Sequence, residues 1–582
     1  MLKELKPDAR CATFQTVNTR MTIAFPSGLN PPLFVNAVRQ LKGDNPIEAK
    51  HLLLRSLREE GETALSYHYL ARAIADTQGK QADVLAAQAR ALKFAPGNPV
   101  FLAAFGLRLV DAGRDQEALA VLSETLARDP QNVLALPWVL RLKRRYLQWG
   151  DQQEEDAALA TLLDGDFVVD PLMLLTFVDD PAVQLRFSRL SAPKVVAQPL
   201  PPHAPHDKIR VGYFSADFRE HATMHLMEGV FKAHDRARFE FYVYDFTPDP
   251  RCRQHQIIRD FADVYQDVSA LSPIQTAELA RRDQLDIAVD LKGRTTDSRP
   301  MIFARRVAPV QVSFLGFPGT TAMAEMDYMI ADNITIPAGD EQYYSEQILR
   351  MPGCYQPTNN ARVVPTGAHP RSKFGLPEDK FIFANFNHPH KVGPSEFATW
   401  MDILRQVPNS VLLFYAGKND LSAELASRAE AHGIDAARIL PCGSLSQQEH
   451  LERIAQVDLC LDCFAYNAHT TASDALWAGV PLLTLCGRQF AARVATSIMS
   501  AAGVPELSTD SKEAYVAAAV RIATNTEELQ VLKRKIKECR HASTLFDTNT
   551  WTRNYEALLT KCHARFLAGE APAHMSLGGD GA

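Results

Sequence analysis

The pattern of hydrophobic and polar positions separates a helical N-terminal part of the chain from a C-terminal part in which strands and helices alternate. From about residue 30 to residue 190, Ala- and Leu-rich segments carry apolar positions at helical spacing. After residue 207 the period changes, and short β-branched and aromatic runs alternate with segments of helix length. This alternation is typical of a mostly parallel sheet covered by helices. The predicted fold class is therefore α followed by α/β.

The strand-like runs form two successive series. In the first series we place strands at residues 208–214, 239–246, 285–291 and 309–317. In the second we place them at residues 380–386, 410–417, 437–443, 458–464 and 480–485. Two α/β units of this size, bridged near residues 335–370, predict two facing Rossmann-like domains with a ligand-binding cleft between them. From Ser511 onward the pattern is again helical.

The N-terminal helical part repeats itself with a period of 34 residues, which separates Gly79 from Gly113, Leu92 from Leu126, and Pro96 from Pro130. Each glycine falls in a tight turn between two helices and each proline ends the second helix, which resembles a tetratricopeptide repeat. Gly43 and Gly150 lie 36 and 37 residues from their neighbours, so we expect about two regular units flanked by divergent ones. The array either holds a peptide on its concave surface or is a plain helical spacer.

Changes in composition mark the domain boundaries. Residues 192–207 contain five prolines and little to bury, which predicts an extended linker or hinge. The predicted segments are an irregular N-terminus at 1–25, tetratricopeptide-like helical repeats at 26–191, the linker at 192–207, an N-terminal Rossmann-like domain at 208–365, a C-terminal Rossmann-like domain with terminal helices at 366–568, and a disordered tail at 569–582.

Composition and charge are those of an ordinary globular protein. Of the 582 residues, 46% are hydrophobic and 22% are charged, and the formal net charge of −6 gives no general nucleic-acid footprint. No apolar run is long enough to span a membrane and no signal peptide is recognisable, so we expect a cytoplasmic protein. The nine cysteines are an odd number without a disulfide framework, as in reduced proteins of the cytosol.

Two short segments match sequence motifs that can bind metal ions. Cys460 and Cys463 form one CxxC, but it lies in an apparent buried strand without a second pair, which favours core packing over metal or redox use. Asp164, Gly165 and Asp166 spell DxD away from any nucleotide-like strand, so we interpret them as a turn. We expect no metal and no cofactor.

The stretch from residue 458 to 485 predicts a strand, a polar turn, a short helix and a second strand. His469, Thr470 and Thr471 fall where the helix begins, so their side chains and the backbone N–H groups of its first turn would face a phosphate. Asp474 shares their helix face and could accept a hydrogen bond from a sugar hydroxyl. The alternative is an ordinary helix start, in which a threonine is the N-cap and Asp474 a first-turn acid.

Three further segments follow predicted strands at the carboxyl ends, where open α/β sheets bind ligands. His221 lies in the loop after the first strand of the first domain, and residues 316–321 follow a later strand with backbone N–H groups that could line an anion pocket. Lys391 follows the first strand of the second domain and points toward the same cleft. A lone lysine is usually a solvated charge, and a lone histidine more often packs or caps than catalyses.

Taken together, six motifs in one order resemble the O-linked N-acetylglucosamine transferases. They are Ser215–Phe218 with His221 and His225–Met227; Leu315–Thr320; Met326–Tyr328 with Ile330 and Asp332; Asn385–Asn387 with Lys391; Val407–Leu412; and His469–Thr471 with Asp474, Leu476–Gly479 and Pro481. The resemblance covers residues 208 to about 565 well and the repeats in outline. Each motif alone is weak, but six in register are specific.

The resemblance implies a GT-B fold and an inverting, metal-independent transfer of N-acetylglucosamine from UDP-GlcNAc to serine or threonine hydroxyls of proteins. Lys391 would bind the diphosphate, and His221 matches a histidine long considered as the general base. The resemblance also implies a donor site in which the phosphates are held by His469, Thr470 and Thr471 and the ribose is held by Asp474. His450 would lie by the uracil or ribose, with His388 nearby. The donor sugar would lie near Pro318, Gly319 and Thr320.

Three positions differ from the pattern of the resembled family. His388 stands where the eukaryotic enzymes carry glutamine, His390 replaces a tyrosine, and Val264 stands where a second active-site histidine was proposed. Two other functions therefore stay open. One is a related protein glycosyltransferase that uses GDP-fucose or modifies asparagine. The other is a non-catalytic repeat scaffold that senses nucleotide sugars.

Overall fold

The computed structural model describes residues 31–578, apart from residues 44, 78, 166, 202–205, 249–251 and 368. Within these ranges the chain forms two compact units, one comprising residues 31–143 and 153–168 and the other residues 144–152 and 169–578. Each is described by itself. Among the described residues, no helix combines the length and the apolar character needed to cross a membrane. The N-terminal segment predicted at 1–25 lies outside the described residues.

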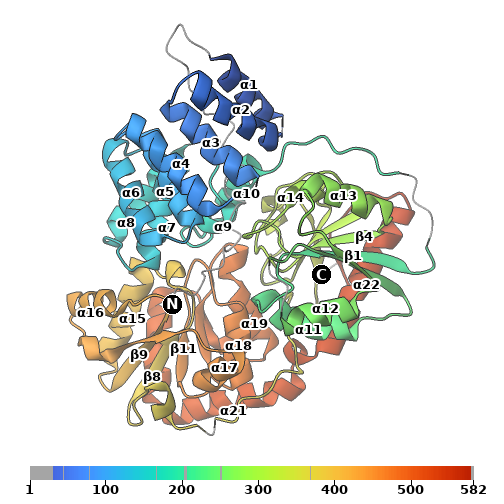
Figure 1. The fold of residues 1–582 in the computed structure, drawn as a ribbon. Helices are drawn as coiled ribbons and strands as arrows, with labels where there is room; N and C mark the ends of the chain where they lie inside the picture. Colours follow the sequence, from blue (N-terminus) through green and yellow to red (C-terminus); the bar gives the residue numbers. More distant parts are fainter. Residues whose placement is uncertain are drawn as a thin grey trace. The chain divides into compact units, whose positions relative to one another are not determined.

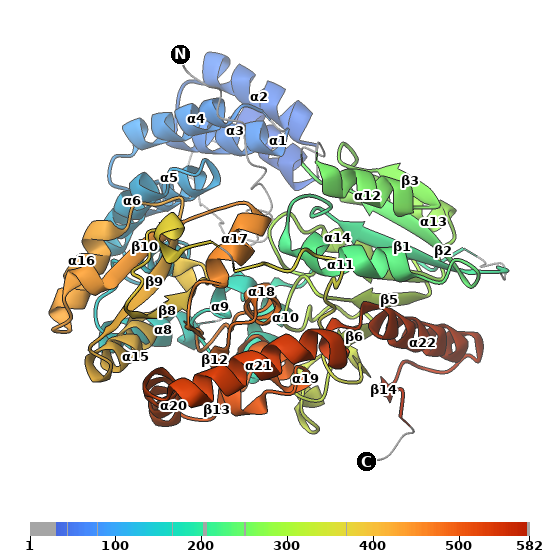
Figure 2. The same cartoon turned by 90° about the horizontal axis from the view of Figure 1, so that it is seen from below.

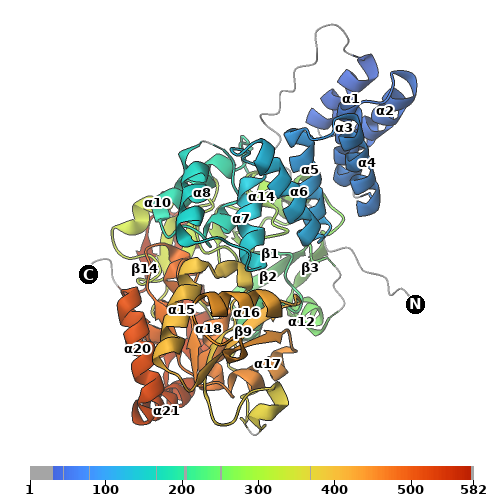
Figure 3. The same ribbon diagram turned by 90° about the vertical axis from the view of Figure 1, so that its left-hand side faces the viewer.

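The first unit consists of helices joined in pairs by short turns (Figures 1 and 3). Their bounds are α1 Pro32–Lys42, α2 Pro46–Glu59, α3 Ala64–Asp76, α4 Gln81–Phe94, α5 Pro99–Asp111, α6 Asp115–Arg128, α7 Leu136–Arg145 and α8 Gln152–Asp164, of which α7 runs into the second unit. Gly113 takes the left-handed conformation with φ +70° between α5 and α6, which glycine adopts without strain. Pro96 and Pro130 follow the ends of α4 and α6, as predicted for two regular repeats.

The second unit begins with a short segment and two helices that the sequence assigned to the repeats. Residues 144–152 and the helices α9 Pro171–Leu174 and α10 Pro181–Ser191 group with the α/β part of the chain. Arg428 donates hydrogen bonds to the backbone carbonyls of Leu147 and Trp149, and Trp149 packs edge-on against Phe397. The sequence assigned residues up to 191 to the repeats, whereas the structure groups residues 144–152 and 169–191 with the α/β part of the chain.

The first lobe of the second unit is an eight-stranded parallel sheet in the order β14-β7-β6-β5-β4-β1-β2-β3. Its strands are β1 Ile209–Ser215, β2 Phe239–Asp245, β3 Val264–Asp267, β4 Ile287–Asp290, β5 Val310–Ser313, β6 Tyr328–Ala331, β7 Gln347–Arg350 and β14 Met575–Ser576. Its helices are α11 Ala222–Ala233, α12 Arg253–Phe261, α13 Pro273–Arg282, α14 Pro300–Phe303 and α22 Thr548–Leu567. The four predicted strands are confirmed as β1, β2, β4 and β5, whereas β3, β6, β7 and β14 were not predicted.

The second lobe is a six-stranded parallel sheet in the order β10-β9-β8-β11-β12-β13. Its strands are β8 Phe381–Asn385, β9 Ser410–Gly417, β10 Ile439–Gly443, β11 Leu459–Leu461, β12 Leu482–Leu485 and β13 Ser508–Thr509. Its helices are α15 Pro394–Gln406, α16 Ser422–Ala431, α17 Gln447–Ile454, α18 Thr470–Ala478, α19 Val494–Ala501, α20 Lys512–Thr524 and α21 Thr526–Ala542 (Figure 3). The predicted fold class, helical repeats followed by two Rossmann-like lobes, is confirmed.

Each sheet reverses its strand order at one point. In the first lobe β1 lies between β2 and β4, and in the second β8 lies between β9 and β11. The crevice at such a switch point, outside the carboxyl ends of the strands, is where doubly wound sheets bind ligands. We therefore expect the ligand-binding and catalytic residues in the loops that follow β1 and β4 in the first sheet, and in those that follow β8 and β11 in the second.

The C-terminal segment returns to the first lobe. Helix α22 lies against α11 and β5, so the red helix runs beside the green strands in Figures 1 and 2. Met575 and Ser576 then pair with Leu349 and Arg350 as β14, at the edge of the first sheet. The terminal helix predicted as part of the C-terminal domain belongs to the first lobe, and the tail predicted as disordered contains an ordered strand. Residues 579–582 lie outside the described residues.

Candidate active site

Lys391 ends the single 3-10 turn Pro389–Lys391 that follows β8. Its Nζ donates a hydrogen bond to the carbonyl of Asn467 at 3.1 Å and lies 3.7 Å from the centroid of the Tyr466 ring. Burial lowers the pKa of the Lys391 ammonium to about 8, because the charged form loses hydration that these two contacts replace only in part. A cation held in this way attracts an anion strongly.

Asp462, at the end of β11, organises the loop on which Lys391 rests. Its buried carboxylate accepts hydrogen bonds from the backbone N–H groups of Cys463 at 2.8 Å and Ala468 at 2.7 Å, and from Asn387 Nδ2 at 3.1 Å and Thr484 Oγ1 at 2.8 Å. Burial raises the pKa of Asp462 to about 6, so the group is still ionised at neutral pH. Sequence analysis missed this residue, although an acidic side chain at the end of an apolar strand was a signal.

His469 lies just before α18 and is a neutral residue. Its Nε2 lies 3.2 Å from the carbonyl oxygen of Ala491, which can only accept, so Nε2 carries the proton. Burial, assisted by the charge of Lys391, lowers the pKa of His469 to about 3. The sequence predicts that this side chain binds the phosphates, and in the structure its Nε2–H donates to the carbonyl of Ala491.

Helix α18 starts at Thr470, as predicted, and ends at Gly479, whose φ of +82° is the left-handed conformation of a glycine C-cap. His469 provides no side-chain cap. Among the residues that the structure describes, no hydrogen bond is found for the hydroxyls of Thr470 and Thr471. A helix start with uncapped N–H groups and two hydroxyls beside a buried lysine is suited to hold a phosphate.

Asp474 pairs with an arginine that the sequence did not single out. Arg362, in the segment that crosses between the lobes, donates through Nη1 to Asp474 Oδ1, and its guanidinium lies 5.3 Å from the centroid of the Trp477 ring. The indole of Trp477 donates to the carbonyl of Val363 at 3.2 Å. The crossing segment therefore fixes one oxygen of the carboxylate that was expected to bind a ribose.

His450 and His388 each accept a hydrogen bond through Nδ1. Arg453 donates to His450 at 3.0 Å, and burial lowers the pKa of His450 to about 4. The Nδ1 atoms of His388 and His390 lie 2.6 Å apart, and the backbone N–H of His390 also donates to His388 at 3.4 Å. Both rings flank the end of β8, since His450 packs edge-on against Phe386. With Nδ1 accepting, the proton of the neutral His450 ring lies on Nε2.

His221 is the N-cap of α11 in the first lobe. Its Nδ1 accepts the backbone N–H of Thr223 at 3.2 Å and lies 3.6 Å from the carboxylate of Asp217. Burial lowers the pKa of His221 to about 4. Asp217 in turn forms a buried ion pair with Lys292, which follows β4, so the switch point of the first sheet carries a charge pair beside the histidine.

The loop after β5 is held by tight packing and by a buried glutamate. A Cβ added to Gly316 would lie 2.2 Å from the carbonyl oxygen of Leu291, so only glycine fits. Thr320 donates through its hydroxyl to Glu346 at 2.6 Å, and Thr321 donates its backbone N–H to the same carboxylate at 2.7 Å. The side chain of Thr320 is therefore part of the loop's framework, while residues 318–320 line a small cavity with Tyr344, Gln489 and Phe490.

The two lobes approach each other where these groups lie. Helix α11 contacts α18, and the charges of Asp474 and Arg362 in the second lobe and crossing segment act on His225 of α11. Within the described part of the chain, no hydrogen bond or ion pair links His221 directly to Lys391. The predicted residues thus form one group around Lys391 in the second lobe and another around His221 in the first.

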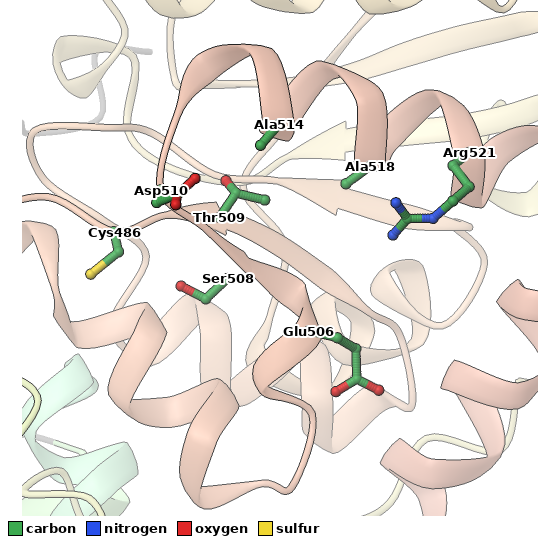
Figure 4. Close-up of a pocket in the computed structure, with 8 residues that line it drawn as sticks. All are labelled: Cys486, Glu506, Ser508, Thr509, Asp510, Ala514, Ala518 and Arg521. Atoms are coloured by element: carbon green, nitrogen blue, oxygen red, sulfur yellow. The ribbon is translucent and has the colours of Figure 1, made fainter.

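Two other features of the described residues bear on the chemistry. Among the described residues, no group of three or more His, Cys, Asp or Glu side chains could hold a metal ion. Figure 4 shows a pocket between β13 and α20, lined by Cys486, Glu506, Ser508, Thr509, Asp510, Ala514, Ala518 and Arg521. It lies at the edge strand of the second sheet rather than at the switch point, and contains none of the predicted site residues.

Comparison with known proteins points to one family. The model of glycosyl transferase family 41 matches residues 198–366 and 359–555. A probable UDP-N-acetylglucosamine–peptide N-acetylglucosaminyltransferase SEC of Arabidopsis thaliana is 36% identical over 376 residues, which cover 64% of this chain and 38% of that protein. The corresponding transferase of Caenorhabditis elegans is 26% identical and matches 63% of this chain and 42% of its own length. The chain thus spans well under half the length of these curated relatives.

A solved structure with a similar fold is that of an O-GlcNAc transferase mutant of Thermobaculum terrenum. The similarity covers 92% of this chain and 96% of that one, with a TM-score of 0.61 and 24% sequence identity. It supports the fold of helical repeats followed by two parallel-sheet lobes.

Proposed function

This chain belongs to glycosyl transferase family 41, and on that premise we propose that it is an inverting glycosyltransferase that moves N-acetylglucosamine from UDP-GlcNAc to serine or threonine hydroxyls of proteins. The donor is the one named for the relatives from Arabidopsis thaliana and Caenorhabditis elegans. Acceptor proteins would bind at the cleft between the lobes, and the concave face of the repeats would hold a peptide.

The observation that carries the proposal is the position of Lys391 beside the start of α18 at the switch point of the second sheet. In the transfer, the acceptor oxygen attacks the anomeric carbon while the bond from that carbon to the β-phosphate breaks, and UDP leaves with the electron pair. Negative charge therefore grows on the phosphate as the bond breaks. A fixed ammonium and a helix N-terminus stabilise that charge more in the transition state than in the ground state.

The remaining donor contacts follow from the second lobe. The backbone N–H groups and hydroxyls of Thr470 and Thr471 would hold the phosphates, and the second carboxylate oxygen of Asp474 would accept from the ribose. His450 would offer Nε2–H to oxygens of the nucleotide, with His388 nearby. Lys391 and α18 supply the positive charge that a metal gives other transferases, so the proposed reaction requires no metal and no cofactor.

His221 would act on the acceptor side. Its Nδ1 already accepts the N–H of Thr223, so in the neutral ring Nε2 carries the proton and would serve as a donor rather than as a base. We therefore assign it to the positioning of the acceptor hydroxyl, whose proton passes to another group or to water as the bond to carbon forms.

The test is a transfer assay with Lys391→Ala beside the intact protein. Radiolabelled UDP-GlcNAc, GDP-fucose and UDP-glucose are offered with a host lysate in the presence of EDTA. Loss of one such charge typically costs about 3 kcal/mol, or about a hundredfold in rate, so the variant is expected to incorporate label at about a hundredth of the wild-type rate or less. Circular dichroism and thermal unfolding check that it folds.

Each outcome of the transfer assay favours one of the functions considered above. Label that enters protein from UDP-GlcNAc, and only with Lys391 intact, supports the proposal. Label from another donor retains the mechanism and changes the substrate. An active, folded Lys391→Ala protein would overturn the assigned role, and the absence of transfer from every donor would favour a nucleotide-sugar sensor.

A further inference from the structure

The segment between α9 and α10 touches both lobes at the candidate active site. Leu175 packs in one apolar cluster with Phe317 of the first lobe and Ala491 of the second, and Tyr466 packs against that cluster. Phe317 belongs to the loop that carries Pro318 and Gly319, and Tyr466 is the ring beneath the Lys391 ammonium. A segment that sequence analysis assigned to the helical repeats thus forms part of the site.

Asp179 ties this segment to the loop formed by residues 486–493. Its carboxylate accepts the backbone N–H groups of Arg488 at 2.9 Å and of Gln489 at 2.8 Å. The side chain of Gln489 returns the contact, since its Nε2 donates to the carbonyls of Leu175 at 3.0 Å and Ala465 at 2.7 Å. Burial raises the pKa of the Asp179 carboxyl, so the carboxylate is held there at a desolvation cost that its backbone contacts offset.

The fit between the two segments is close. A Cβ added to Gly487 would lie 2.4 Å from Asp179 Oδ2. Glycine at this position therefore allows the carboxylate to approach the loop backbone closely enough to accept two adjacent N–H groups.

The 486–493 loop continues the contacts to Lys391. The carbonyl of Ala491 accepts the backbone N–H of Asn467 at 2.9 Å and the Nε2–H of His469 at 3.2 Å. The carbonyl of the same Asn467 accepts from Lys391 Nζ at 3.1 Å. Asp179 is therefore connected to the Lys391 ammonium group through the backbone of the 486–493 loop and the hydrogen bonds that Ala491 and Asn467 make.

We propose that Asp179 is a positioning residue for the transfer reaction, which holds the 486–493 loop so that Lys391 and the start of α18 face the departing diphosphate. This inference rests on the proposed function. It also gives the end of the helical part a role in the chemistry, because a displacement of residues 175–179 moves the loop that fixes Asn467.

The test compares Asp179→Ala with Asp180→Ala in the full chain. Asp180 is the matched control, since it caps α10 through the backbone N–H of Ala182 at 2.8 Å and reaches the 486–493 loop only through an exposed ion pair with the Arg488 side chain at 3.7 Å, a contact of little energetic weight. Displacement of a reacting group by about 1 Å can cost about a hundredfold, so Asp179→Ala is expected to lower kcat by about that factor, with a smaller change in KM. Asp180→Ala is expected to retain the wild-type kcat.

A second readout does not depend on activity. Competitive labelling with acetic anhydride across a pH series, read by mass spectrometry, measures the pKa of Lys391. In the intact protein the expected value is about 8, and in Asp179→Ala it moves toward 10.5 as water reaches the amine. If the wild-type protein transfers no sugar, the proposed function fails while this measurement still decides the positioning role.

The inference is overturned by a folded Asp179→Ala protein whose Lys391 pKa and kcat equal those of the wild type, or by an equal effect of Asp180→Ala. If Asp179→Ala does not fold, Asp179→Asn decides in its place, because its amide retains one carbonyl oxygen as an acceptor. An intermediate fall in kcat is expected for that variant, and wild-type behaviour contradicts the proposal.

Discussion

At the residue scale, burial controls the protonation of the candidate catalytic groups. Lys391 lies between an aromatic ring and a carbonyl, and His221 and His469 each use a ring nitrogen for a backbone contact. Desolvation disfavours the charged form of all three. At neutral pH the histidines are therefore neutral, and the lysine is the charged group of the three.

These protonation states predict the pH dependence of the reaction. Lys391 must be protonated to stabilise the leaving group, so kcat/KM for the donor is expected to fall as the pH rises through about 8. His221 stays neutral down to about pH 4, so no decline near its ordinary pKa of 6.5 is expected on the acid side. The measurement is kcat/KM from pH 5 to pH 10.

Lys391→Arg serves as the control for this profile. A guanidinium stays protonated throughout the range, so the alkaline decline should disappear even where the rate itself is lower. A wild-type profile that stays flat to pH 10 would contradict the lowered pKa of Lys391. An acid decline near pH 6.5 that is lost in His221→Asn would show a titrating base.

At the element scale, loops at the carboxyl ends of the strands depend on close backbone approach. Gly316 lies against the backbone of Leu291 and Lys292, next to the ion pair with Asp217. The loop after β5 and the loop after β4 are therefore packed as one unit, and the shape of residues 316–320 follows from that contact.

Substitution of Gly316 tests this packing. In Gly316→Ala the added Cβ would meet Leu291 O at 2.2 Å and Leu291 C at 2.8 Å, atoms of a backbone that cannot rotate away. Overpacking of this kind typically costs about 1–3 kcal/mol of folding free energy, and we expect both a lower unfolding midpoint in denaturant and weaker transfer. In the control Gly443→Ala, the Cβ meets only Gly417 O at 3.5 Å. Equal stability of the two variants would refute the argument.

At the scale of the whole molecule, helix α22 from the end of the sequence packs against the first lobe. Glu556 on this helix accepts hydrogen bonds from His234 Nδ1 and from the backbone N–H of Asp235, both at 2.8 Å. His234 also lies 2.9 Å from the hydroxyl of Tyr213 in β1. All of these side chains are buried, so a helix from the end of the sequence completes the core of the first lobe.

Removal of Glu556 is expected to weaken the first lobe selectively. Glu556→Ala leaves two buried donors unsatisfied, each at a cost of about 1–3 kcal/mol. Hydrogen exchange should therefore lose protection in β1, α11 and α22, while β8, β9 and β11 keep theirs. Glu570→Ala removes an exposed partner of Arg565 and should change little. Equal loss in both lobes would show that α22 does not belong to the first.

The sequence by itself determined the helices and strands, and the order along the chain of the loops that form the site. Short β-branched and aromatic runs gave nine strands within a few residues of their observed bounds, and glycines and prolines at fixed spacing gave the helix pairs. Because parallel strands carry ligands at their carboxyl ends, the loops with His221, Lys391 and His469 could be named before any contact was known. These are local signals, carried by neighbouring residues.

Only the tertiary structure decided what those residues touch. Arg362 meets Asp474 across 112 positions, and Asp179 meets Gln489 across 310, while Glu556 meets His234 across 322. No periodicity or spacing links residues so far apart, since a hydrogen bond depends on how the lobes and loops pack and leaves no local trace in the chain. For the same reason, the lowered pKa of Lys391 followed from its burial. The assignment of α22 to the first lobe and of residues 169–191 to the second unit followed from their packing. The sequence specifies neither burial nor packing.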